Sequence, residues 1–340
     1  MPRPPLAIVH RKPVKNLFSG LLLAVLSLLL FAAAAEVYVR LTESDGENFD
    51  IEMWRYAGDL KRVSDIPGMG HEHVPGRSGV YMGVPVAINA HGWRDKDYPL
   101  NKPEDAVRIM MLGDSVTFGW GAPPEGVTAN LLEDMLNQGG GRLYEVLNTG
   151  IGNTNTAMQS AYFLNEGYRF KPDIVVLNYF INDAEPTPAR KENVFVEHFY
   201  SAVFLAGRLD VFMRTYFGRG DWRRYYQNLY HEDQSGWQTA KAALRQLAAF
   251  CRSEGIRLMV VNYPELHELS PYPFQAASDL VAAEAEAEGL PFVDLLPTVA
   301  GEEPRSLWVT ATDAHPNGKA AARFAARIKQ ALAESFPQAF

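Results

Sequence analysis

Three side chains in this sequence are of the types that acyl transfer requires. Ser115 follows an apolar stretch in the run Leu112-Gly113-Asp114-Ser115, where a hydroxyl is placed to act as a nucleophile. Asn182 follows another apolar stretch and can donate its side-chain N–H to an oxyanion. His315 lies shortly before the last apolar-periodic segment and can serve as a general base. Together these residues supply a nucleophile, an oxyanion donor and a base.

A glycine-containing block adds backbone donors to this set. Residues 148–156 read Asn-Thr-Gly-Ile-Gly-Asn-Thr-Asn-Thr, and glycines there allow a tight turn that presents N–H groups. Each signal alone has a plainer interpretation: a helix N-cap for Ser115, a strand-to-helix turn for the glycine block, an Asx turn for Asn182 and a surface position for His315. All four nevertheless fall after successive predicted strands or at the start of the last helix. This common placement favours one site.

The elements that must position these residues alternate between strand-like and helix-like segments. Short runs rich in Val, Ile and Leu, without period-two alternation, are typical of parallel strands covered on both faces. The predicted strands are Val107–Leu112, Glu145–Asn148, Ile174–Tyr179, Arg257–Asn262 and Phe292–Leu296, and the predicted helices are Gly126–Asn137, Trp237–Arg252, Gln275–Glu288 and Asn317–Glu334. The pattern predicts a five-stranded, doubly wound parallel α/β sheet, whose ligands bind outside the carboxyl ends of the strands.

An insertion interrupts the alternation between Asp183 and Gln234. It is dense in aromatic residues and arginines: Phe195, Phe199, Tyr200, Phe204, Phe212, Tyr216, Phe217, Trp222, Tyr225, Tyr226 and Tyr230, with Arg219, Arg223 and Arg224. Its place after the third strand predicts a lid or substrate wall above the active face. The alternative is a helical subdomain whose aromatic side chains form their own core.

The amino terminus predicts a membrane helix. Residues 17–35 carry no charge and no proline, and a helix of this length can span the hydrocarbon core. Basic residues precede the segment and Glu36 follows it, which predicts a cytoplasmic N-terminus and export of the rest. A retained signal anchor is favoured over cleavage near residues 32–35, because the apolar run exceeds a usual signal-peptide core. A buried core helix of a soluble protein is the remaining alternative.

Charge and cysteine content exclude several function classes. The formal net charge is −8, and four basic residues without an acid lie in residues 1–16, so residues 17–340 carry −12. Such a chain is not expected to be a general nucleic-acid binder. The single cysteine, Cys251, rules out an internal disulfide and cysteine-based zinc clusters, and we expect a buried thiol. His71 and His73 near Glu72 lack a third ligand at diagnostic spacing, so no metal site is predicted.

The ordered blocks resemble the SGNH family of GDSL-type esterases and lipases. The resemblance covers roughly residues 107–332 and rests on the Gly-Asp-Ser motif, the glycine block, Asn182-Asp183 and the Asp313-x-His315 run. The run Asn-Ala-His-Gly-Trp-Arg at 89–94 also looks like a lead-in of exported, membrane-anchored members. The resemblance implies a flavodoxin-like, three-layer α/β/α fold and ester hydrolysis without a metal or organic cofactor.

The resemblance also implies roles for individual residues. Ser115 would be the nucleophile and His315 the base, and the oxyanion hole would combine the Ser115 N–H, a glycine-block N–H and the Asn182 side chain. The glycine-block donor is Gly152 or Asn153, depending on the alignment. The candidate acid, Asp313, stands two residues before His315. In the family pattern the acid stands three residues before the histidine, a position that Thr312 occupies in this chain. If Asp313 does not contact Nδ1, a Ser–His dyad remains.

These expectations define a domain plan and several functions. The plan is a cytoplasmic basic segment (1–16), a transmembrane anchor (17–35), a stalk and N-terminal extension (36–105), and a hydrolase domain (106–336) with the insertion at 184–234. The predicted function is hydrolysis of acyl esters, O-acetyl above all, on an acylated small molecule or an envelope glycan outside the cytoplasm (the periplasm in a Gram-negative source), or in a secreted form after cleavage. Alternatives are O-acetyl transfer through the same acyl-enzyme, a non-catalytic glycan-binding protein and an envelope scaffold.

Overall fold

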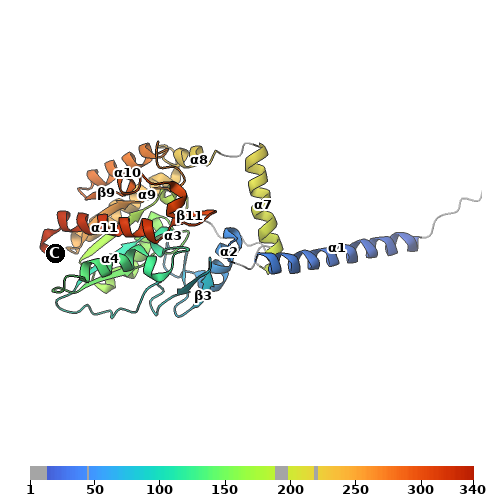
Figure 1. Ribbon diagram of the computed structural model, residues 1–340, viewed down its shortest axis with the longest axis horizontal. Coiled ribbons are helices and arrows are strands. Elements are labelled where there is room, and N and C mark those ends of the chain that lie inside the picture. The colour runs from blue at the N-terminus through green and yellow to red at the C-terminus, as the bar shows by residue number, and fades with distance from the viewer. Residues whose placement is uncertain (1–13, 44–45, 188–197, 218–220) are drawn as a thin grey trace, which may run out of the picture.

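A five-stranded parallel sheet forms the centre of the α/β part of the chain (Figure 1). The computed structural model describes residues 14–43, 46–187, 198–217 and 221–340. The sheet order is β6-β5-β7-β8-β9 and every pairing is parallel. Its strands are β5 (Val107–Leu112), β6 (Tyr144–Asn148), β7 (Ile174–Tyr179), β8 (Arg257–Asn262) and β9 (Phe292–Asp294). In order of appearance this is 2-1-3-4-5, the flavodoxin-like order, so the predicted fold is confirmed.

Helices cover both faces of this sheet, which explains why β5, β6 and β7 are buried along their whole length. One face packs against α4 (Thr128–Asn137) and α11 (Gly318–Ser335). The other packs against α5 (Thr156–Asn165), α9 (Ser235–Ser253) and α10 (Gln275–Ala287). Four of these helices lie within about two residues of their predicted bounds. The fifth, α5, was not predicted; its start is marked by Asn155, whose side chain accepts a hydrogen bond from the Met158 N–H.

Residues 49–87 are ordered, although the sequence showed little periodicity there. They form α2 (Phe49–Leu60), the hairpin β1 (Lys61–Val63)–β2 (His71–His73) and the hairpin β3 (Ser78–Tyr81)–β4 (Val84–Ala87). Buried side chains of α2 and the second hairpin meet Phe118 and Trp120 in one cluster. The extension therefore packs directly against the loop that follows β5.

The N-terminal helix α1 (Val14–Thr42) projects away from the rest of the molecule (Figure 1). Its segment Leu17–Thr42 has a mean hydropathy of 2.5 over the most apolar window, and none of that window is buried. The large apolar side chains from Leu17 to Phe31 are 48–79% exposed. This exposure is not that of a core helix, and length and composition fit either a membrane span or a signal sequence.

The insertion divides into two described helices that lie in different places. Helix α7 (Tyr200–Phe217) lies against α1 and α2, at some distance from the sheet (Figure 1). Helix α8 (Trp222–Leu229) packs on the core of the α/β part through Trp222 and Tyr226. The insertion is thus neither only a lid nor a separate subdomain with its own core. Phe195 and Arg219 lie outside the described residues, as do the side chains of Tyr216 and Phe217.

Candidate active site

Ser115 begins the short helix α3 (Ser115–Phe118), immediately after the carboxyl end of β5. The N-cap of this helix is Asp114, whose carboxylate accepts a hydrogen bond from the Val116 N–H at 2.9 Å. The cap role suggested as the plainer interpretation of Ser115 thus belongs to its neighbour. Ser115 is only 7% exposed, and its hydroxyl points to a histidine that is distant in sequence.

A continuous hydrogen-bonded chain joins Ser115, His315 and Asp313. Ser115 Oγ lies 2.9 Å from His315 Nε2, and His315 Nδ1 lies 2.6 Å from Asp313 Oδ1. Because a carboxylate only accepts, Nδ1 carries the proton and Nε2 is free to accept from the serine hydroxyl. Trp120 Nε1 donates to the second oxygen, Asp313 Oδ2, at 3.0 Å. The side chain of Asp313 therefore contacts Nδ1 despite its short spacing from His315.

The hydrogen bonds around Asp313 keep it ionised. Burial raises the pKa of this carboxyl, but the hydrogen bonds from His315 and Trp120 outweigh burial, and the net pKa lies below the usual range. Both histidine and aspartate lie on β11 (Asp313–Pro316), which pairs antiparallel with β10 (Trp308–Thr310). The hairpin formed by β10 and β11 was not predicted, and it holds His315 over the end of β5.

Asn182 lies beside the turn that carries Ser115, in the 3₁₀ turn η3 (Ile181–Ala184) that follows β7. Its side-chain Nδ2 donates to Asp114 Oδ2 at 3.1 Å. Burial raises the pKa of Asp114, while the Val116 N–H, His315 and Asn182 act in the opposite direction. Asp183, the next residue, is also buried and accepts hydrogen bonds from Thr156, Gln159 and the Phe180 N–H. These bonds fix η3 and hence the amide of Asn182.

The two candidate donors of the glycine block differ in their surroundings. The Gly152 N–H donates to the Tyr56 hydroxyl at 3.2 Å, and Tyr56 comes from α2 in the N-terminal extension. Asn153 is exposed and has φ +62°, a left-handed conformation usually adopted by glycine. Tyr56 thus uses the N–H of Gly152 and leaves that of Asn153 as the other candidate.

Tyr56 belongs to a buried hydrogen-bond relay that the sequence did not reveal. His73 Nδ1 donates to the Gly92 carbonyl at 2.9 Å, so His73 Nε2 accepts from the Tyr56 hydroxyl at 2.6 Å. Burial lowers the pKa of His73 to about 3, which keeps the ring neutral. On the other side of the glycine block, Lys61 and His71 contact the Gly152 carbonyl. The extension therefore contacts both backbone polar groups of Gly152, its N–H and its carbonyl oxygen.

Both histidines lie in β2: His73 is part of this relay, and His71 contacts the Gly152 carbonyl instead. No group of three His, Cys, Asp or Glu side chains within the described ranges could hold a metal ion.

A cavity of about 480 Å³ opens beside His315. Its aromatic walls come from three elements far apart in sequence: Phe49 of α2, Phe180 after β7, and Trp222 and Tyr226 of α8. Glu265 and His267 add a polar edge and are paired with each other. The position of this cavity, next to the Ser115–His315 pair, makes it the candidate substrate site.

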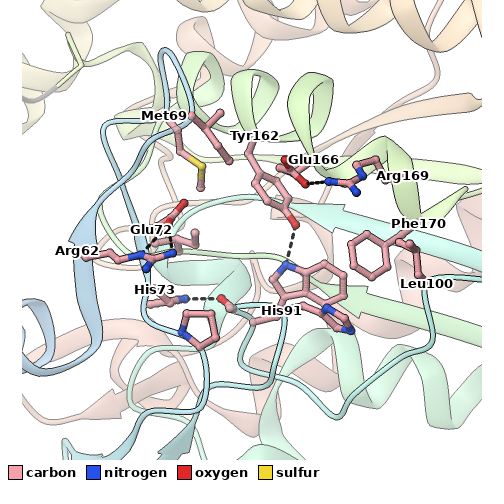
Figure 2. Close-up of a pocket in the computed structure, with 15 residues that line it drawn as sticks. Arg62, Met69, Glu72, His73, His91, Leu100, Tyr162, Glu166, Arg169 and Phe170 are labelled. Atoms are coloured by element: carbon pink, nitrogen blue, oxygen red, sulfur yellow. Dashed lines mark hydrogen bonds and ion pairs between the residues drawn. The ribbon is translucent and has the colours of Figure 1, made fainter.

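A second cavity, of about 350 Å³, lies between the extension and α5 (Figure 2). Trp93 Nε1 donates to the Tyr162 hydroxyl at 2.7 Å within it, and the pairs Arg62–Glu72 and Glu166–Arg169 are at its edges. None of the predicted site residues lines this cavity. It is a contact zone of the extension and not the candidate active site.

The flavodoxin-like sheet brings these polar side chains together at its carboxyl edge, where ligands of such sheets bind. The family model described as GDSL-like lipase/acylhydrolase matches residues 111–323, and the chain belongs to this family. The match spans β5 to α11 and so includes every predicted site residue.

Solved structures with a similar fold have low sequence identity. One is TesA, with 20% identity, a TM-score of 0.45, and coverage of 66% of this chain and 97% of that one. A catalytic mutant of Axe2, an acetylxylan esterase from Geobacillus stearothermophilus, has 16% identity, a TM-score of 0.44, and coverage of 66% and 94%. LAE5, an α/β hydrolase from the metagenome of Lake Arreo, has 17% identity, a TM-score of 0.44, and coverage of 66% and 94%. No curated protein matches the chain.

Proposed function

We propose that the protein is a serine esterase in which Ser115 is the nucleophile, His315 the base and Asp313 the residue that orients and stabilises the imidazole. The observation that carries the proposal is the hydrogen-bonded chain Ser115 Oγ–His315 Nε2, His315 Nδ1–Asp313 Oδ1. This chain has the geometry and the tautomer that general-base activation of a serine needs.

In the proposed reaction, His315 Nε2 takes the proton of Ser115 as Oγ bonds to the acyl carbon. The carbonyl π electrons move to oxygen, and the resulting oxyanion is held by the Ser115 N–H, the Asn153 N–H and the Asn182 Nδ2. The imidazolium then protonates the departing alcohol as the C–O bond breaks, leaving an acyl-serine. A water molecule, deprotonated by His315, attacks that ester, and Ser115 leaves with the proton.

We choose Asn153 over Gly152 as the backbone donor of this hole. In support, the Gly152 N–H is engaged by Tyr56, whereas Asn153 occupies the exposed, left-handed position of the turn. Asn182 is supported by its hydrogen bond to Asp114, which places its amide next to the residue that precedes the nucleophile.

For the substrate we propose O-acetyl esters carried on a glycan. The cavity beside His315, at about 480 Å³, is much larger than an acetyl group and is walled by aromatic rings with one polar edge. Aromatic faces and a few polar groups suit a sugar ring, which has apolar faces and hydroxyl edges. The apolar helix α1 supports an exported, membrane-anchored protein whose hydrolase domain lies outside the cytoplasm.

The test of this proposal is turnover of p-nitrophenyl acetate and of acetylated glycans by wild type and Ser115→Ala. We expect wild type to release p-nitrophenol and acetate and to be labelled by a fluorophosphonate. We expect Ser115→Ala to lose both ester turnover and labelling, while its free energy of unfolding stays within about 1 kcal/mol of wild type. Equal turnover by the two proteins would refute the assignment. Absence of labelling in wild type would instead favour a non-catalytic glycan-binding protein.

A further inference from the structure

The cavity beside His315 is bordered by a second carboxylate–imidazole pair, Glu265 and His267. Both residues lie in the loop that joins β8 to α10, shortly after the carboxyl end of β8. Ligands of a doubly wound sheet bind outside this edge. The chemistry proposed for Ser115, His315 and Asp313 uses neither member of this second pair.

Glu265 holds the imidazole of His267 in one orientation. Glu265 is only 6% exposed; its Oε1 accepts the hydrogen bond of His267 Nδ1, and its Oε2 accepts the backbone N–H of His267 at 2.9 Å. Because a carboxylate only accepts, Nδ1 carries a proton in both protonation states of the ring. This hydrogen bond raises the pKa of His267, although burial opposes it. Both oxygens of a buried carboxylate are thus used to position one histidine.

Two tryptophan rings contact the same imidazole. The ring centroid of His267 lies 5.3 Å from that of Trp222 and 4.9 Å from that of Trp308. Trp308 Nε1 also donates to the Leu266 carbonyl at 2.9 Å, which ties the loop to β10. Strand β10 pairs with β11, the strand that carries His315. The two imidazoles that border the cavity are therefore both attached to one hairpin.

The second ring nitrogen of His267, Nε2, is left to the cavity. The side chain is 48% exposed, and Nε2 has no hydrogen-bond partner within the part of the chain that the structure describes. Depending on the protonation of the ring, Nε2 accepts or donates one hydrogen bond. A hydroxyl group pairs with Nε2 in either state, because a hydroxyl both donates and accepts. A carboxylate pairs only with the imidazolium.

The charges at this edge of the cavity favour a neutral partner over an anion. Three carboxylates act on the imidazole of His267 through their negative charge, those of Glu265, Glu268 and Asp313. The nearby Arg223 is already paired with Glu268. An incoming carboxylate would compete with these acids for their cationic partners and would be repelled by them.

We propose that His267, positioned by Glu265, binds a sugar hydroxyl of the substrate through Nε2, and that the alcohol part of the ester is a neutral rather than an acidic glycan. The inference deepens the proposed function and rests on it, because it concerns the alcohol part of the ester that Ser115 attacks. The aromatic walls contact the apolar faces of the sugar, and the imidazole fixes its rotation. His267 is a substrate-binding residue here and takes no part in proton transfer with Ser115.

Two substitutions separate Nε2 from the rest of the ring. In His267→Asn the short amide still reaches Glu265 in the manner of Nδ1, and nothing replaces Nε2. In His267→Gln the longer side chain brings an amide to about the place of Nε2. His231→Asn is the matched control, because His231 is exposed and does not line the cavity. All variants are made in the full-length Ser115→Ala protein, the parent, so that bound esters are not cleaved.

Binding is measured by calorimetric titration in detergent with three probes. These are methyl 4-O-acetylglucoside, its 2,3,6-tri-O-methyl ether, which has no free hydroxyl, and methyl 4-O-acetylglucuronide, which carries a carboxylate. We expect the parent to bind the glucoside about 3–10-fold more tightly than the other two probes, the factor that one hydrogen bond is worth. His267→Asn should lose this advantage and bind the ether as the parent does. His267→Gln should recover most of it, and His231→Asn should match the parent.

Several results would overturn the proposal. They are equal binding of the glucoside by the parent and His267→Asn, equal binding of the glucoside and its ether by the parent, tighter binding of the glucuronide, and no binding of any probe. Equal weakening in the Asn and Gln variants would exclude Nε2 as the binding atom. Weaker binding of the ether by His267→Asn would indicate a structural role instead.

The chemistry of Ser115 is tested separately, by turnover of p-nitrophenyl acetate in the protein that retains this serine. Absence of that turnover would refute the esterase proposal, whereas the dissociation constants of the sugars would still report on His267.

Discussion

At the scale of single residues, the short spacing between Asp313 and His315 is compatible with an orienting carboxylate. Asp313 Oδ1 accepts both the backbone N–H of His315, at 3.0 Å, and its ring Nδ1–H. An aspartate can bond locally to a backbone N–H two residues on. Here that turn also brings the carboxylate to the ring, so the residue that stands three positions earlier is not needed.

Replacement of Asp313 by asparagine should lower kcat by about 10³–10⁴-fold with little change in KM, because the amide no longer fixes the tautomer or stabilises the imidazolium. Thr312→Ala is the matched control, since Thr312 occupies the family's usual acid position. Steady-state kinetics on p-nitrophenyl acetate measures both. A larger loss of kcat in Thr312→Ala than in Asp313→Asn would contradict the orienting role of Asp313.

We expect Tyr56 to act indirectly, by positioning the backbone of the glycine block that contributes to the proposed oxyanion hole. Tyr56→Phe deletes the hydroxyl that joins the Gly152 N–H to His73, so kcat should fall about tenfold while KM stays near wild type, and unfolding should lose about 1–3 kcal/mol. Tyr81→Phe removes a hydroxyl that donates to Asp59 in the same cluster. It should alter stability without a change in kcat, and equal kcat losses in the two variants would contradict the role.

At the scale of elements, the hydrolase core was predictable and the extension was not. The strands read as continuous apolar runs because both faces of the sheet are covered, and each predicted strand is present. The extension lacks that signal, because α2 spreads its buried side chains over contacts with two hairpins and with the turn after β5. The β10–β11 hairpin gave no such signal either, since its four-residue strand Asp313–Pro316 alternates polar residues, the proposed catalytic pair Asp313 and His315, with Ala314 and Pro316.

The packing of the extension on the glycine block predicts a pH dependence of stability. His73 is buried and neutral, with a folded-state pKa of about 3 against 6.5 for the free side chain. The unfolded chain therefore binds a proton that the folded chain does not between these values. The contribution of His73 to the free energy of unfolding is complete above pH 6.5, and it falls by about 1.4 kcal/mol per pH unit as the pH drops below that value.

Comparison with His73→Gln isolates this contribution from the other titrating groups. Urea unfolding in detergent at pH 7.5 and pH 5.0 should show wild type losing more free energy of unfolding than the variant, by about 2 kcal/mol. The same pH dependence in both proteins would mean that His73 is not held neutral by burial.

Helix α8 is expected to contribute to recognition rather than to chemistry. Trp222 lines the cavity beside His315 and contacts the rings of His267 and Phe274. Trp222→Ala should raise KM for an acetylated glycan about tenfold, since it removes one aromatic wall, and should leave kcat for p-nitrophenyl acetate within about twofold. Equal effects on both substrates would argue for a structural role of Trp222.

At the scale of the whole molecule, the N-terminal part of the chain connects the apolar helix α1 with the candidate active site. The same helix, α2, supplies Phe49 to the cavity and Ile51 to the cluster with α1 and α7. Charge is also distributed unevenly along the chain, because the excess of acidic residues lies entirely after the basic N-terminal segment, residues 1–16. The sequence indicated the apolar helix and this charge asymmetry, whereas the junction depends on single contacts that no periodicity shows, such as the hydrogen bonds from the Tyr200 and Ser201 N–H groups to Glu36.

The position of Phe49 and Ile51 on α2 bears on how the enzyme would reach its substrate. The Phe49 ring stacks on His315, with centroids 6.1 Å apart, and two residues further on Ile51 is fixed against Val39 at the foot of α1. Less than one helical turn of α2 thus separates the residue stacked on the imidazole from the residue packed at the end of α1. If α1 spans a bilayer as we propose, this packing would hold Ser115 at a short and constant height above the lipid, and acyl groups carried further out would have to bend inward to be cleaved.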